Sequence, residues 1–175
     1  MVAYASDKRF ESVAGEIKIR LSSENSLSFG DCAQVLKDID AIFRATSREV
    51  TARVSGNNAK KRDGFLVARE FRNGSLEIIA DPYFAGVVTG VVANAIFSTF
   101  IYTMRRINGR PQSDEREPLN LVDKNVMRED RLKEAASKAV SATANHRKSL
   151  HDKGKIFNLS IQITYMNKTW NVTED

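Results

Sequence analysis

The chain has 175 residues, of which 42% are hydrophobic and 28% charged, and its formal net charge is +5 at pH 7. This balance fits one domain over residues 1–175 with its own core, and it argues against a largely disordered chain. The positive charge is compatible with nucleic acid, anionic lipid or an acidic protein as partner. The single cysteine, Cys32, excludes an intrachain disulfide framework. Because the first residues show no leader-like apolar run, we expect a cytoplasmic protein.

The first predicted elements are a strand and a helix. Residues 13–22 alternate apolar and polar side chains, and this period of two predicts a strand with one wet face. Ser28 then offers an N-cap for an amphipathic helix that we expect to end near Thr46. The pattern leaves open whether residues 49–55 form a short strand.

A hairpin is expected next, after an exposed loop. Two alternating runs between residues 65 and 80 flank Asn73-Gly74, a pair that favours a type I′ turn. A two-residue loop would place Glu70 opposite Glu77, which is an unfavourable pair. A loop one residue longer would place Arg69 there instead. The hairpin is therefore predicted and its register is left open.

An apolar segment follows, for which we expect one helix from Pro82 to Ile107 with Asp81 as its N-cap. Between Pro82 and Met104 there is no charged residue and no histidine. That length suffices to cross a bilayer. However, leucine is absent and Asn94 lies at the centre, where an amide is costly in lipid. We favour a helix buried in protein; the alternative is a single transmembrane helix at 82–104 in an inner or plasma membrane.

Such an apolar segment is hard for the rest of a small chain to cover, so we expect a homo-oligomer. The contact is predicted at the small and amide residues of the segment: Gly86, Gly90, Ala93 and Asn94. A basic patch is predicted at the end of the helix: Arg105, Arg106 and Arg110. We expect this patch to be solvated surface. The alternative is an anchor at a membrane surface, and nucleic acid is a less favoured partner.

The C-terminal third is predicted to be helical and then extended. Residues 119–150 have a helical composition, as one helix broken near 128–131 or as two helices. Residues 157–165 alternate again, and a turn at 167–168 would allow a last strand. The layout predicts an α+β fold. Its antiparallel sheet combines the N-terminal strand, the Asn-Gly hairpin and the C-terminal strand, and it packs against one amphipathic helix, one long apolar helix and a C-terminal helical region.

Few residues suggest chemistry. His146 and His151 lie about 140° apart around a helix, which does not make a metal site. No Gly-x-Ser-x-Gly, phosphate-cradling loop or HExxH pattern occurs. We predict no catalytic, cofactor or metal residues. The leading hypothesis is a non-enzymatic, self-associating interaction or accessory protein. Its alternatives are a membrane-acting effector that spans the bilayer at 82–104 and a basic nucleic-acid-binding accessory protein.

Overall fold

The computed structural model describes residues 10–12, 15–22, 28–54, 64–72, 76–85, 90–108, 117–154, 158–165 and 167–172. The strands are β1 (Phe10–Ser12), β2 (Gly15–Ser22), β3 (Gly64–Arg72), β4 (Leu76–Ala85), β5 (Asn158–Tyr165) and β6 (Lys168–Asn171). The helices are α1 (Phe29–Val54), α2 (Gly90–Ile107), α4 (Glu129–Ala142) and α5 (Ala144–Gly154), with a 3-10 helix η2 at Glu117–Leu121. The predicted α+β fold with an antiparallel sheet is confirmed.

The sheet is built around β4. This strand pairs with β3 along one edge and with both β1 and β2 along the other, and β5 and β6 continue beyond β2. All the described pairings are antiparallel. The predicted alternation of β2 is present, since Ile17, Ile19 and Leu21 are buried.

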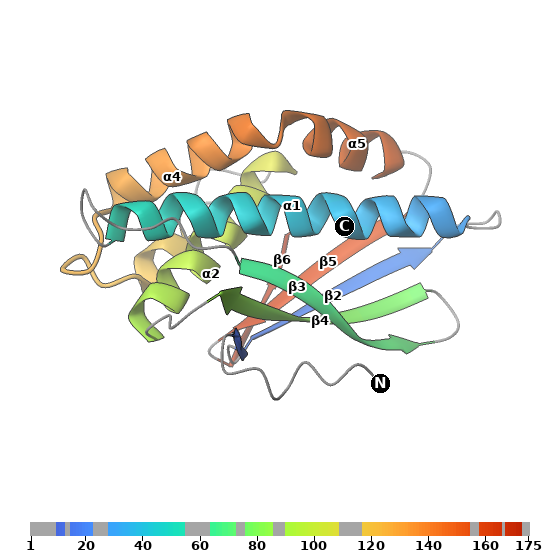
Figure 1. The fold of residues 1–175 in the computed structure, drawn as a ribbon, viewed down its shortest axis with the longest axis horizontal. Coiled ribbons are helices and arrows are strands. Elements are labelled where there is room, and N and C mark those ends of the chain that lie inside the picture. The colour runs from blue at the N-terminus through green and yellow to red at the C-terminus, as the bar shows by residue number, and fades with distance from the viewer. Residues whose placement is uncertain are drawn as a thin grey trace.

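The helices cover one face of the sheet, which we call the inner face (Figure 1). Helix α1 lies against this face, α2 packs beside it, and α4 and α5 lie along the far side of α1. Phe43 of α1 is the centre of the core, because its ring contacts Phe84, Phe97 and Phe100 at centroid distances of 5.8, 6.0 and 5.1 Å. The helical layer is therefore held to the sheet by aromatic side chains from three elements.

Helix α1 begins as predicted and ends later than predicted. The Ser28 hydroxyl accepts the Asp31 backbone N–H at 3.1 Å, which confirms the cap. The helix runs on through residues 49–54 to Val54, so the end near Thr46 was wrong and the undecided segment is helical. The hydroxyls of Thr46 and Thr51 donate to carbonyls four residues back, at 2.8 Å each. Their polar groups are thereby satisfied inside the helix.

The start of the apolar helix was predicted wrongly. Residues 82–85 belong to β4, and α2 begins only at Gly90, although it ends at Ile107 as expected. Tyr83 stacks on Phe65 of β3 at 5.9 Å, and Phe84 reaches Phe43. These contacts between distant segments outweigh the local Asp-Pro signal. The segment 82–104 is thus not one helix. No helix within the described residues has the length and apolar character needed to span a bilayer.

The register of the hairpin differs from both alternatives. Arg72 lies opposite Glu77 and Glu70 opposite Ile79, and a bulge between Ala68 and Glu70 then shifts the pairing of residues 64–68 with β4. The Glu77 carboxylate instead receives a hydrogen bond from Arg20 of β2 at 2.7 Å. The turn at 73–75 and the loop at 55–63 lie outside the described residues.

The C-terminal third contains two helices rather than one. Helix α4 begins at Glu129, and the break before α5 falls at Thr143, where both the N–H and the hydroxyl bond to the Ala139 carbonyl. The predicted last hairpin is present as β5 and β6. Asn167 lies in its turn with a φ of 61°, a left-handed conformation that asparagine tolerates well.

Candidate functional site

The four residues predicted for self-association do not form one exposed patch among the described residues. Ala93 is buried in the core of the chain. Asn94 donates a hydrogen bond from Nδ2 to the Leu121 carbonyl at 3.0 Å, so its amide holds η2 against α2. Gly90 is exposed at the first residue of α2, with open space where a Cβ would stand. Gly86 lies outside the described residues.

The basic patch is also divided. The Arg105 guanidinium lies over the Trp170 ring at 5.2 Å, and its Nε donates to the Asn171 carbonyl at 3.3 Å. Arg105 therefore ties the end of α2 to β6, a structural role that cation–π contact supports. Arg106 is exposed, and Arg110 lies outside the described residues.

A hollow of about 320 Å³ opens between α1 and the inner face of the sheet, beside the edge strand β3. We call it the α1–β3 groove. Its lining residues are Ile19, Leu36, Lys37, Asp40, Leu66, Ala68, Ile78 and Ala80. Only Lys37 and Asp40 are charged, and both come from α1. Apolar walls with a few polar groups are typical of sites that bind small molecules.

The groove exists because the sheet lacks side-chain volume at this point. Ala68 of β3 and Ala80 of β4 are directly paired across the strands. Both line the groove, so two neighbouring positions under α1 carry only a methyl group. The bulge between Ala68 and Glu70 sets this pairing, because residues 64–68 and residues 70–72 pair with β4 in different registers. No sequence pattern marked these alanines, because their pairing depends on that bulge.

One end of the groove is fixed by a network around Asp40. Its Oδ1 accepts the Leu66 backbone N–H at 2.8 Å, and its Oδ2 accepts Nε of Arg44 at 2.7 Å. The Arg44 guanidinium in turn lies 5.5 Å from the centre of the Phe65 ring. Asp40 thus holds the edge strand to α1, and its charge is paired.

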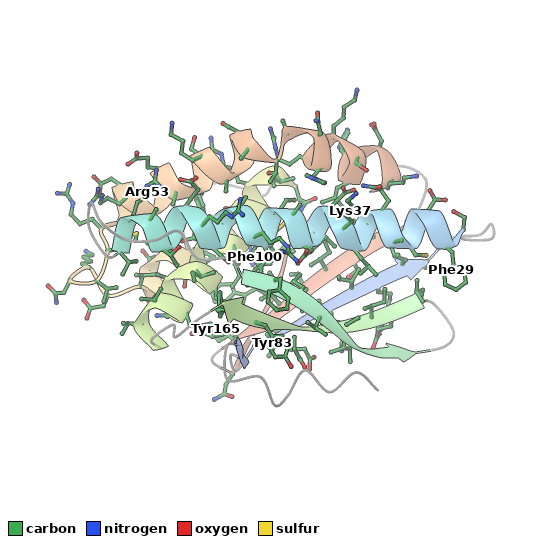
Figure 2. All side chains as sticks on the ribbon, viewed as in Figure 1. Phe29, Lys37, Arg53, Tyr83, Phe100 and Tyr165 are labelled. Carbon is green, nitrogen blue, oxygen red and sulfur yellow. The ribbon has the colours of Figure 1, made fainter. Side chains whose placement is uncertain are left out.

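Lys37 lies one helical turn before Asp40 on the same side of α1. Figure 2 labels it on α1, with Tyr83 on the sheet below. It is exposed, and its ammonium has no hydrogen-bond or ion-pair partner among the described residues. Within the part of the chain that the structure describes, the groove lining therefore carries one charged group without a partner, and its charge is positive.

A second polar cluster joins α1 to α5. The side chain of Asp38 is fully buried, and its Oδ1 lies 2.7 Å from Nδ1 of His146 and 2.7 Å from Nε2 of Gln34. Its Oδ2 has no hydrogen-bond partner in the described part of the chain. No sequence pattern pointed to this pair, since its two members lie far apart along the chain and His146 was considered only as a metal ligand or a solvated helix end. His151 is exposed.

Two further titratable groups lie at the start of α1. Hydrogen bonds from Lys153 and from Ser28 lower the pKa of Asp31 below its ordinary value of 3.8. Burial, and then the charge of Asp31, raise the pKa of the Cys32 thiol above 9.0. Because a reactive cysteine needs a lowered pKa, Cys32 has the character of a small apolar side chain.

Comparison with protein-family models, curated proteins and solved structures finds no match. Among the residues that the structure describes, no three His, Cys, Asp or Glu side chains gather in a way that could hold a metal ion. The α1–β3 groove is the feature on which we base a function, because it combines a hollow, apolar walls and a lysine without a partner among the described residues.

Proposed function

We propose that this chain is a non-enzymatic accessory protein that binds an apolar ligand in the α1–β3 groove. The supporting observation is the hollow of about 320 Å³ with six apolar lining residues. This volume lies at the lower end of the range of roughly 300–1,000 Å³ that ligand pockets occupy. Apolar surface in such a groove is unfavourable while it is wet, so an apolar ligand gains free energy by covering it.

Self-association through the apolar helix is a second, weaker candidate. It rests on the composition of the segment and on Gly90, which is exposed and has room around it. It is weakened by the burial of Ala93 and by the hydrogen bond from Asn94 to η2, which engage two of the four predicted residues inside the chain. Light scattering of a Gly90→Leu variant tests it, because a contact at that surface would be disturbed by a large side chain.

Octanol, a neutral apolar probe, tests the groove. In an amide NMR titration we expect the largest shifts at residues in the lining, such as Leu66, Ala68 and Ile19. Ala68→Phe should abolish these shifts, because Ala68 is exposed and a ring there would fill the hollow. The matched control is Val67→Phe, whose side chain points to the opposite face of the strand.

Both variants should keep the far-ultraviolet circular dichroism of the parent chain. Binding that is unaffected by Ala68→Phe, or lost equally in Val67→Phe, would contradict the assignment of the ligand to this groove.

A further inference from the structure

We infer that the ligand is a medium-chain aliphatic carboxylate, with its carboxylate at Lys37 and its chain over Ala68 and Ala80. This inference rests on the proposed binding function of the α1–β3 groove and adds the chemical class of the ligand. It follows from the charges of the groove and from the shape of its floor.

The charge argument begins with Asp40. This carboxylate is already bound by the Leu66 N–H and by Arg44, so it does not offer a free anion to a cationic ligand. Lys37 has no partner among the described residues. A ligand anion would therefore meet an available ammonium and no competing free carboxylate. The net charge of +5 also favours the approach of an anion.

The lining argues against more polar ligands. Recognition of phosphate relies on several strong donors, such as an arginine fork or a cluster of backbone N–H groups. The described lining offers one amine, that of Lys37, and its six other free side chains are apolar. A sugar would leave its hydroxyls without partners. A single anionic head with a hydrocarbon tail matches this distribution.

The side chains of the sheet, which form the floor of the groove, indicate that the ligand has a thin, unbranched tail. Ala68 and Ala80 lie side by side across two strands, with the larger Leu66 and Ile78 next to them in the lining. A chain of methylene groups can lie over the two methyl groups, and each buried methylene adds favourably to binding. The volume of about 320 Å³ also limits the tail to a medium length.

Octanoate and octanol differ mainly in charge, so they separate this inference from the proposed function. Because an exposed ion pair contributes up to about fivefold in affinity, we expect Lys37→Gln to weaken octanoate by about threefold to fivefold. Octanol binding should not change in that variant. The matched control is Lys18→Gln, which removes a lysine from the outer face of β2. High salt should reduce the affinity of the parent chain for octanoate and leave octanol unaffected.

The outcomes are distinct. If both probes bind the groove equally and Lys37→Gln changes neither, the carboxylate assignment is wrong while groove binding stands. Tighter binding of octylammonium than of octanoate would also overturn it, in favour of a cation at Asp40. If neither octanol nor octanoate shifts the lining amides, both the inference and the proposed function fail. Weaker binding of octanoate alone in Lys37→Gln, with Lys18→Gln unchanged, supports the inference.

Discussion

Replacing His146 by alanine should destabilise the protein mainly through the carboxylate left behind. Asp38 is fully buried, and its Oδ1 has two described partners at 2.7 Å, the His146 Nδ1 and the Gln34 amide. Losing one hydrogen-bond partner of a buried charged group costs about 1.5–3 kcal/mol. The histidine side chain is 31% exposed, so water can partly replace it. We therefore expect His146→Ala to lower the free energy of unfolding by about 2 kcal/mol.

Urea unfolding followed by circular dichroism measures this cost. The midpoint should fall while the denaturant dependence stays constant, which indicates a change in stability alone. His151→Ala is the control, since His151 is exposed on the same helix, and its effect should stay within about 0.5 kcal/mol. A double-mutant cycle with Asp38→Asn isolates the charge, and the two changes should couple by about 1 kcal/mol or more.

Two results would refute this reasoning. A cost for His146→Ala no larger than that for His151→Ala would mean that the imidazole does not stabilise the buried carboxylate. An equal cost of His146→Ala in the parent and in the Asp38→Asn background would mean that the imidazole does not stabilise the charge of Asp38.

The remaining predictions concern a close contact and an ion pair. Gly64→Ala should destabilise by about 1–3 kcal/mol, because a Cβ there would stand 2.8 and 2.9 Å from ring carbons of two buried phenylalanines. The methyl group of Gly90→Ala would stand in open space, so this variant should be neutral or more stable by up to about 1 kcal/mol. Equal urea midpoints for Gly64→Ala and Gly90→Ala would contradict this difference. Because hydrogen bonds from Lys153 and Ser28 lower the pKa of Asp31, the ionised Asp31 carboxylate stabilises the folded chain. This stabilisation is complete above the unfolded pKa of 3.8 and is lost as pH falls through the lower folded pKa. The stability difference between the parent and Lys153→Met should thus shrink from roughly pH 5 to pH 2, and a constant difference would refute it.

The elements that sequence predicted well are those encoded by neighbouring residues. The alternation in 15–22, the Ser28 cap and the strand–turn–strand at the C-terminus all rest on local periodicity or turn chemistry. The start of α2 was predicted wrongly because Asp81-Pro82 is, by itself, a good local signal for the start of a helix. What decides it is the contact of Tyr83 with Phe65 and of Phe84 with Phe43, which no short window of sequence contains.

The candidate site was missed for a related reason. The groove needs Ala68 and Ala80 to be paired, and that pairing follows from a bulge that the sequence did not predict. An alanine in a strand is otherwise unremarkable. Asn94 was predicted as a self-association residue because an amide in an apolar segment needs a hydrogen-bond partner. In the structure its amide donates to the Leu121 carbonyl of the same chain, which lies 27 residues further along and which no local pattern indicates.

Helix α1 explains why Lys37 has no acidic partner among the residues that the structure describes. Asp38 and Asp40 are two residues apart, so they point about 160° apart around the helix and do not face one another. Asp38 is engaged with α5 and Asp40 with the edge strand, so each carboxylate is bound on its own side. Lys37 is next to Asp38 in sequence, but neither Asp38 nor Asp40 is bonded to it among the described residues. An anion that enters the groove therefore meets an ammonium that no described residue neutralises, which is the basis of the ligand class that we infer.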